Sequence, residues 1–456
     1  MAASPAPAHT EAAGAPGFAG YGSKSYRAYV LGMLLLVYTF NFIDRTVISI
    51  VQEPIKQEFG LSDLQLGLLG GPAFALLYTL LGIPIARLAE RHNRMTILSV
   101  CLAVWSGFTA LCGVAGNYLQ LFAARVGVSV GEAGCTPPAQ SVIADYFPAD
   151  RRATALSVYS LGVPIGSMIA AVGGGWIATE VGWRQAFILL GLPGILLALL
   201  VKASVREPPR AGSAATAPGF GETLRVLSKK PAFWHMAMGG AITSFVGYGV
   251  GGFLPPFLMR VHGLTLLEAS QFAGVILGAA AAVGTFMSGF LADRIAKRHP
   301  NALAWLPALG LFIATPLFLG AYFAPTLTWA IAPMVIGAMC QYFYLGPMYT
   351  VAQGVVSPRM RATATAILLF IVNMIGYALG PPFIGAVSDL LANQALAASD
   401  LSVALCGKAS EANAAACAAG QAQGLQYAMM IGVCFFLWAA AHFMFVARTL
   451  QRDTVS

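Results

Sequence analysis

The chain has 456 residues, of which 58% are hydrophobic and only 10% are charged, and its formal net charge is +8. Soluble domains carry about a quarter charged residues, so this composition excludes a protein whose whole surface faces water. The apolar runs last roughly 20 residues, which suits membrane-spanning helices and is too long for the strands of a membrane barrel. The composition therefore predicts an all-α membrane protein.

The apolar runs form two sets of six, separated by a polar segment. Residues 1–27 are rich in Ala, Pro and Gly and are expected to form a disordered tail. An N-terminal six-helix bundle is predicted over 28–202, with spans at about 28–52, 64–87, 95–115, 118–142, 153–179 and 183–202. After a cytoplasmic linker at 203–231, a second bundle is predicted over 232–448, with spans at about 232–257, 268–291, 302–323, 328–351, 362–389 and 424–447. It includes an outer loop at 391–423, and residues 449–456 form a C-terminal tail.

The Lys and Arg residues gather on one side of the predicted membrane. If both termini are cytoplasmic, most of the 26 cations lie on that side, and the other side keeps Lys56, Arg184, Arg260 and Lys408. This excess is the positive-inside signal of membrane proteins. It predicts a multi-pass protein of a bacterial inner membrane with both termini in the cytoplasm. It also accounts for the basic charge without a nucleic-acid partner.

The two halves carry matching motifs. Residues 82–94 read GIPIARLAERHNR after the second span, and residues 289–298 read GFLADRIAKR after the eighth. A second pair, RATA at 152–155 and at 361–364, follows later in each half. These motifs resemble the GxLADR signature of the major facilitator superfamily, although Glu90 stands where the family usually has Asp and Ala86 where it has Gly. The resemblance implies twelve spans in two pseudo-symmetric bundles that work by alternating access.

The same resemblance implies a gate on the cytoplasmic side. A carboxylate near a helix N-terminus is stabilised by the helix dipole by about 0.3–1 kcal/mol. Glu90 is expected to face the start of the eleventh span and Asp293 the start of the fifth, so that these contacts hold the cytoplasmic side shut. The residues assigned to this gate are Glu90, Arg91, Arg152, Asp293, Arg294 and Arg361. The alternative is that both acids only set the topology.

A closer resemblance is to the Spinster-like branch, which includes bacterial members and eukaryotic exporters of sphingosine-1-phosphate and lysophospholipids. The residues that carry it are NFIDR at 41–45 in the first span, and RVG at 125–127 and GEA at 131–133 in the fourth. The ending Asn93-Arg94 of the first loop also fits. This resemblance implies an amphiphilic anionic substrate.

Four ionisable residues fall inside the predicted spans, namely Asp44, Arg45, Arg125 and Glu132. An intramembrane charge costs at least about 2.5–3.5 kcal/mol, so such residues are functional candidates. Asp44 and Arg125 are expected at one depth, and Arg45 could reach down to Glu132. Burial disfavours a charged Glu132 whereas a nearby arginine favours it, so we expect Glu132, and secondarily Asp44, to carry a proton. The freed arginine would then hold an anionic head group. The alternative is a permanent ion-pair network that locks the first span to the fourth.

The second half has no comparable interior charge. Its polar and aromatic span residues suggest a cavity that is charged on one side and aromatic on the other, although each of them alone could simply be packing. The possible lining residues are Thr243, Ser244, Phe245, Tyr248, Gln341, Tyr342, Tyr344, Asn373 and Tyr377.

These patterns predict a monomeric, proton-coupled secondary transporter of an anionic amphiphile, with a proton-coupled organic-anion importer and a multidrug efflux carrier as alternatives. No nucleotide-binding P-loop and no hydrolase or zinc-protease motif is present, so neither an ATP-driven pump nor an enzyme is expected. No metal site and no cofactor other than the coupling protons is predicted. Cys406 and Cys417 lie on the predicted outer side, where a disulfide and free thiols are both open alternatives.

Overall fold

The computed structural model describes residues 20–209, 220–406 and 411–455, except for the side chains at positions 83, 90, 149, 150, 153, 358, 411 and 412. Within these ranges every regular element is a helix, which agrees with the all-α prediction. Most of the predicted N-terminal tail, residues 1–19, lies outside the described residues.

The N-terminal half contains the first eleven α-helices and one π-helical turn. They are α1 (Lys24–Ile50), α2 (Gln52–Phe59), α3 (Asp63–Gly70), α4 (Pro72–Arg91), α5 (Arg94–Cys112), α6 (Tyr118–Glu132), α7 (Thr136–Tyr146), α8 (Ala149–Ser160), α9 (Gly162–Ile169), η1 (Ala170–Gly174), α10 (Gly175–Glu180) and α11 (Trp183–Ser204). The linker between the halves contains α12 (Phe220–Ser228).

The C-terminal half repeats this plan. Its elements are α13 (Pro231–Gly252), α14 (Leu254–His262), α15 (Leu266–Gly274), η2 (Val275–Ala280), α16 (Ala281–Ala296), α17 (Ala302–Phe323), α18 (Leu327–Gln341), η3 (Tyr342–Tyr344), α19 (Leu345–Gly354), η4 (Pro358–Met360), α20 (Arg361–Ile371), η5 (Val372–Tyr377), α21 (Ala378–Leu396), η6 (Ala397–Ser399), α22 (Val403–Cys406) and α23 (Glu411–Asp453).

Among the described residues, ten helices are long and apolar enough to cross a membrane, or eleven if the bent pair α13 and α14 forms one span. The other predicted span, 118–142, is present as α6 and α7. The helix breaks at Ala133-Gly134-Cys135, so neither piece is long enough to count alone. Two predicted boundaries were wrong: most of the expected outer loop 391–423 is helical, and α23 continues through the expected C-terminal tail to Asp453.

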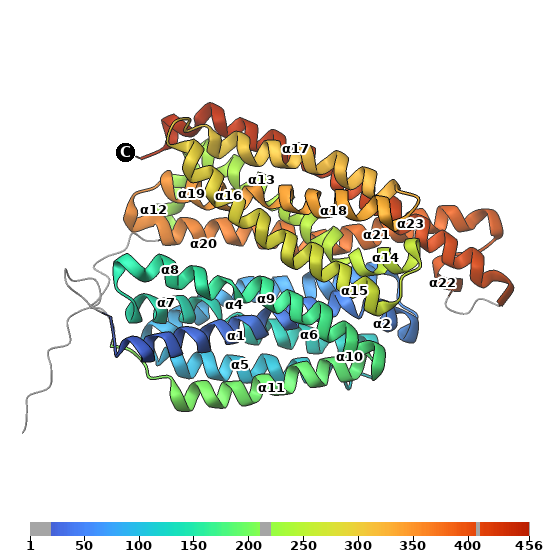
Figure 1. Ribbon diagram of the computed structural model, residues 1–456, viewed down its shortest axis with the longest axis horizontal. Coiled ribbons are helices and arrows are strands. Elements are labelled where there is room, and N and C mark those ends of the chain that lie inside the picture. The colour runs from blue at the N-terminus through green and yellow to red at the C-terminus, as the bar shows by residue number, and fades with distance from the viewer. Residues whose placement is uncertain (1–19, 210–219, 407–410, 456) are drawn as a thin grey trace, which may run out of the picture.

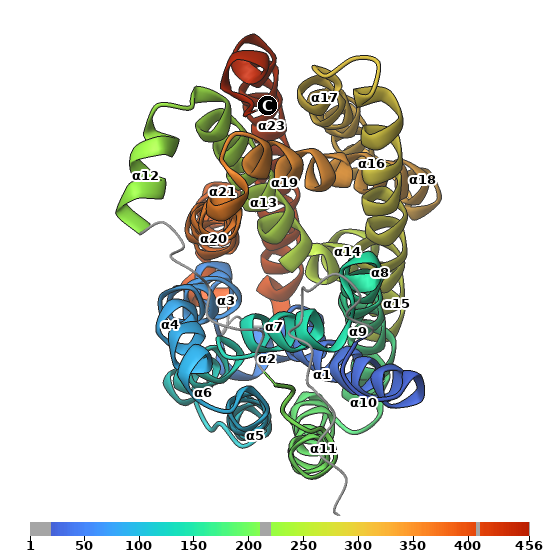
Figure 2. The ribbon, with the colours of Figure 1, turned by 90° about the vertical axis from the view of Figure 1, so that its left-hand side faces the viewer.

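The two halves lie side by side, with both ends of the described chain and α12 at one end of the molecule (Figure 1). We call this the terminal end, and the end that carries α2, α10, α14 and α22 the opposite end. The halves pack together through α3 and α21, and through α9, η1 and α10 against α15 and η2. By contrast, the described residues of α7 and α8 form no substantial contact with α16, α19 or α20 (Figure 2). The halves are therefore closed at the opposite end and apart at the terminal end.

The helices that pair across the halves are interrupted near their middle. The second span breaks at Gly71 between α3 and α4, and π-helical turns interrupt the fifth, eighth and eleventh spans at η1, η2 and η5. Such turns occur often at functional sites. The interruptions at η2 and η5 separate α15 and α21, which pack across the halves, from α16 and α20, which reach the terminal end.

Candidate functional site

A buried ion pair joins the first and fourth spans of the N-terminal half. The Arg45 Nε lies 2.7 Å from the Glu132 Oε2, and the amide of Asn41 donates to the same oxygen at 2.8 Å. Glu132 and Asn41 are fully buried, whereas the Arg45 side chain is 12% exposed. Arg45 therefore reaches Glu132 as the sequence suggests, and Asn41 is a site residue that the sequence reasoning missed.

Glu132 is the last residue of α6, directly before the helix break. The next three residues form hydrogen-bonded turns before α7 begins, so the carboxylate sits at an interruption of the regular α-helix. The other carboxylate oxygen, Oε1, has no hydrogen-bond partner among the described residues. A buried polar atom without a partner is costly. The site therefore has unused hydrogen-bonding capacity for a proton on Glu132.

Asp44 and Arg125 lie beside each other at the centre of the same half, and both are fully buried. The Arg125 Nη1 donates to the backbone carbonyl of Asp44 at 3.0 Å, not to its carboxylate. Both carboxylate oxygens of Asp44 and the Nε and Nη2 of Arg125 lack hydrogen-bond partners among the described residues. The two groups are thus close but not locked into one bonded pair.

Aromatic rings enclose the two arginines. The Arg45 Cζ lies 4.4 Å from the ring centre of Tyr78 and 4.7 Å from that of Phe74, and the Arg125 Cζ lies 5.7 Å from the Phe74 centre. Such cation–π contacts contribute roughly 0.5–2 kcal/mol each. Phe74 also packs against Tyr377 of the other half, with ring centres 5.3 Å apart. Phe74 therefore contacts both arginines and the facing half.

The predicted lining residues of the C-terminal half lie in different surroundings. Tyr248 and Tyr377 stack with ring centres 4.2 Å apart, and the hydroxyls of Ser244 and Tyr344 lie 3.1 Å apart. Gln341 and Tyr342 border a cavity, and Asn373 is half-buried. Phe245 packs on Phe383 and Phe435. Thr243 is buried and donates to the carbonyl of Gly239.

The residues predicted as the terminal-end gate are not joined across the halves. Arg91, Asp293, Arg294 and Arg361 are exposed, and among the described residues none of them forms an ion pair. Arg152 donates to the carbonyl of Ala144 within its own half. The side chain of Glu90 lies outside the described residues. This arrangement agrees with halves that are apart at this end.

The ion pairs that do join the halves lie at the opposite end, and the sequence reasoning missed them. Arg260 of α14 contacts Glu53 of α2 and, through two nitrogens, the carboxylate of Asp63 of α3 at 2.9 and 3.0 Å. Asp63 also accepts from Lys56 at 2.7 Å. Burial, followed by the neighbouring Arg260, lowers the pKa of Lys56. We call Glu53, Lys56, Asp63 and Arg260 the opposite-end network. Lys56 and Arg260 are two of the few cations that the sequence places on this side of the membrane. Their rarity there was the signal that could have pointed to this network.

A second contact supports this closure. The carboxylate of Asp389 on α21 accepts from the backbone N–H groups of Asp63 and Leu64 at 2.9 and 2.8 Å, so an acid of one half caps the first turn of α3 in the other. The cap satisfies donors that a helix N-terminus leaves unpaired. Below it, a methyl group at Gly67 would overlap the backbone of Pro381. The halves therefore meet here with backbone almost against backbone.

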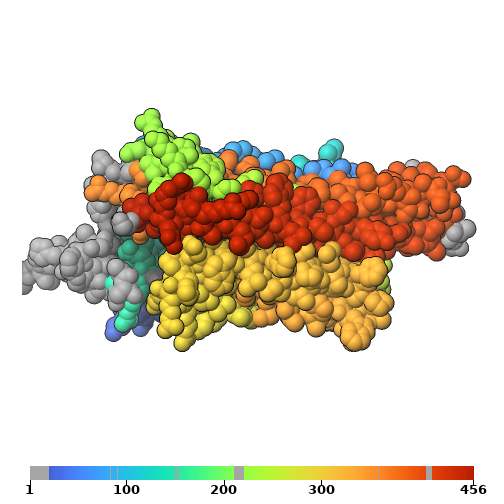
Figure 3. Space-filling model, turned by 90° about the horizontal axis from the view of Figure 1, so that it is seen from above, coloured from blue at the N-terminus to red at the C-terminus, as the bar shows by residue number. Residues whose placement is uncertain are grey.

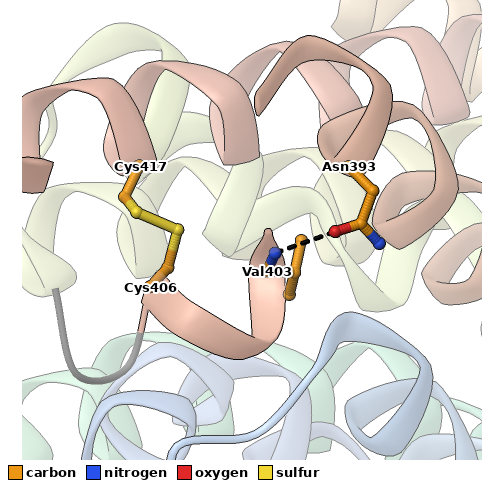
Figure 4. Close-up of a disulfide and its surroundings, with 4 residues drawn as sticks. All are labelled: Asn393, Val403, Cys406 and Cys417. Carbon is orange, nitrogen blue, oxygen red and sulfur yellow. Dashed lines mark hydrogen bonds between the residues drawn. A yellow bond between two sulfur atoms is a disulfide. The ribbon is translucent and has the colours of Figure 1, made fainter. Parts of the chain in front are cut away.

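Cys406 and Cys417 form a disulfide that ties α22 to the start of α23 (Figure 4). The side-chain carbonyl of Asn393 also accepts from the backbone N–H of Val403, which fixes the start of α22. Of the two alternatives that the sequence left open, a disulfide and free thiols, the structure has the disulfide. The bridge lies at the opposite end, outside the helical bundle (Figure 1).

Two packed helical halves with charges buried between spans are typical of secondary transporters. The chain matches the model of the Major Facilitator Superfamily over residues 34–407, and it belongs to this family. It is therefore a membrane transporter and not an enzyme.

Its relatives point to one branch of that family. A crystal structure of a bacterial homologue of the human lysosomal transporter Spinster, described as inward-facing and unoccupied, is 42% identical; the match covers 95% of this chain and all of that one, with a TM-score of 0.87. An MFS-type efflux pump of Mycolicibacterium smegmatis is 35% identical over 79% of this chain and 84% of its own. Protein spinster homolog 1 of Xenopus tropicalis is 28% identical over 80% of this chain and 74% of its own. The chain thus closely resembles the Spinster proteins.

Proposed function

We propose that this transporter is proton-coupled and moves an amphiphilic anionic small molecule, such as a lysolipid or a sphingolipid-like compound, across the membrane. The observation that carries the proposal is the buried pair of Arg45 and Glu132, which stands at a helix break with part of its hydrogen-bonding capacity unused. The desolvation of such a pair costs several kcal/mol or more, which makes it a candidate for function.

The coupling step follows from the chemistry of this pair. When Glu132 accepts a proton it becomes neutral, and its attraction for the guanidinium of Arg45 falls. Arg45 is the partly exposed member of the pair, so it is the group that can turn toward a ligand. Its planar fork suits a phosphate or a carboxylate. Asp44 is the second candidate proton carrier, because its carboxylate is buried beside Arg125 and forms no ion pair with it among the described residues.

The C-terminal half supports the amphiphilic part of the proposal. A cavity between α13, α17, α18 and α23 is lined mainly by apolar side chains, including Phe318, Met334 and Phe436, with Gln341 and Tyr342 at its polar side. Apolar pockets with a few polar groups are typical ligand sites. The cavity holds only about 30 Å³, so it supports the apolar character of the C-terminal half, and an acyl chain would bind there only after these side chains move apart.

Orientation is part of the same proposal. Most cations lie at the terminal end, which is expected for the cytoplasmic side of a bacterial inner membrane. The disulfide lies at the opposite end, and disulfides persist in oxidising compartments. Both observations support cytoplasmic termini, and the halves would then be open toward the cytoplasm.

Two other cargo classes follow from specific observations. The efflux pump of Mycolicibacterium smegmatis favours a multidrug carrier, in which Glu132 would be the counter-charge for cations. The two arginines favour a proton-coupled importer of organic anions.

The test is ligand-induced stabilisation of the purified protein at pH 5.5 and pH 7.5. Lysophosphatidylglycerol, succinate and ethidium represent the three cargo classes. The proposal expects stabilisation by the lysolipid that depends on pH, and loss of that dependence in Glu132→Gln but not in Glu180→Gln, which changes an exposed acid. Stabilisation by ethidium alone would instead assign the multidrug class, and stabilisation by succinate alone would assign the organic-anion class.

A further inference from the structure

The linker helix α12 lies outside the helical bundle at the terminal end. It contacts α13 and α20 only along one side. Seen from the terminal end it stands at the periphery of the C-terminal half (Figure 2), and from above it projects beside α23 (Figure 3). A helix of nine residues is too short to be stable alone in water. Packing on α13 and α20 therefore stabilises it, and its outward surface is left uncovered by the described residues.

The residues of α12 are sorted by face. Thr223 and Leu227 are buried against the bundle. Next to this buried side, Phe220 and Leu224 project outward and are 54% and 38% exposed. They are four residues apart and so lie on one stripe of the helix. The remaining sector is polar.

The polar sector is basic where the chain turns toward α13. Arg225 lies in the last turn of α12, and Lys229 is the first residue after the helix ends. Both side chains are exposed. Glu222 is the acid of this sector. The Lys230 Nζ donates to the backbone carbonyl of Asp453, so this cation is already engaged. Arg225 and Lys229 therefore have no ion-pair partner among the described residues. At about 100° per residue, Arg225 lies roughly a quarter turn around the helix from Leu224, and Lys229 follows the end of the helix.

The height of α12 is fixed by its junction with the seventh span. Only Lys229 and Lys230 separate it from α13, and the Trp234 indole N–H in the first turn of α13 donates to the Leu227 carbonyl at 2.9 Å. Trp234 is 37% exposed, and tryptophans at such positions mark the membrane–water interface. The helix therefore lies directly beside the start of the seventh span.

We infer that α12 is an interfacial helix that binds anionic phospholipid head groups, with Arg225 and Lys229 contacting phosphates while Phe220 and Leu224 enter the acyl region. A short helix with an apolar stripe and flanking cations is typical of membrane-surface binding. The inference uses the proposed orientation only to name the leaflet, which would be the cytoplasmic one. It does not depend on the transported molecule.

The test is lipid binding to the full-length, detergent-purified protein by native mass spectrometry, with phosphatidylglycerol and phosphatidylcholine titrated separately. Each cation near a head group contributes about fivefold in affinity, so Arg225→Gln with Lys229→Gln should weaken phosphatidylglycerol binding by roughly 25-fold and leave phosphatidylcholine binding unchanged. The matched control is Lys297→Gln with Arg298→Gln, which removes two exposed cations after α16 at the same end.

A separate pair, Phe220→Ser with Leu224→Ser, should weaken the binding of both lipids, and the unfolding temperature should fall only slightly because both side chains are only partly buried. The inference is overturned if the Arg225 and Lys229 variant binds phosphatidylglycerol like the wild type. It is equally overturned if the control loses as much affinity, because the basic end as a whole would then attract the lipid. Neither outcome would bear on transport coupling at Glu132.

Discussion

Arg260 offers a direct way to shift the balance between the two conformations. Its guanidinium contacts Glu53 and Asp63 of the other half and is 7% exposed. In Arg260→Met these acids keep only Lys56 as a cationic neighbour. Removing one partner of a buried ion pair costs about 3–5 kcal/mol. Because the acids regain water when the opposite end opens, this cost falls on the closed state alone, and the populations should shift by about a hundredfold or more.

The shift can be measured by pulsed electron resonance between spin labels at Gln57 on α2 and Leu390 on α21, which are exposed at the opposite end of the two halves. The five free cysteines are replaced beforehand. We expect one short distance in the wild type and a longer one in Arg260→Met. The control is Arg184→Met, since Arg184 pairs with Glu58 within one half and both are partly exposed. An unchanged distance distribution in Arg260→Met would refute the reasoning.

Three further predictions concern the same end of the molecule. Gly67→Leu, which drives a side chain into the facing backbone of α21, should lengthen the same spin-label distance, whereas Gly107→Leu, which meets open space, should leave it unchanged. Hydrogen bonds from Arg184 lower the pKa of Glu58, so the stabilisation exists above about pH 4.3 and disappears as the pH falls through the lowered value. The unfolding temperature of Glu58→Gln should accordingly lie slightly below that of the wild type at pH 7 and converge with it as the pH falls through the lowered pKa of Glu58; a gap that persists at the lowest pH would contradict this. Cys417→Ser removes a bridge with a sequence separation of 11, worth at most about 3 kcal/mol in local chain entropy, and should speed proteolysis around α22 without changing transport.

Much of the architecture follows from one-dimensional patterns. Apolar runs place the spans because a span must be long and uncharged. The contact between Arg45 and Glu132 could also be predicted from the sequence, because both are charged residues in apolar runs and charged side chains inside a membrane usually pair with one another. The bond from Asn41 to Glu132 was not, because a neutral amide in a span gives no comparable signal.

The residues that join the halves could not be derived in the same way. Arg260 and Asp63 are distant in the chain, and their contact depends on which end is closed. The expected gate at the terminal end was predicted from a motif. In this conformation the two halves are apart at that end, so Asp293 is exposed. The helix breaks at Gly71 and after Glu132 also escape hydropathy, because they do not interrupt the apolar run.

The most direct test of the central claim is transport of a labelled lysolipid into or out of proteoliposomes driven by an imposed pH gradient. With coupling through Glu132, the wild type moves the lipid against its gradient, whereas Glu132→Gln retains lipid exchange without a gradient but loses pH-driven accumulation. Undiminished pH-driven accumulation in Glu132→Gln would contradict the account.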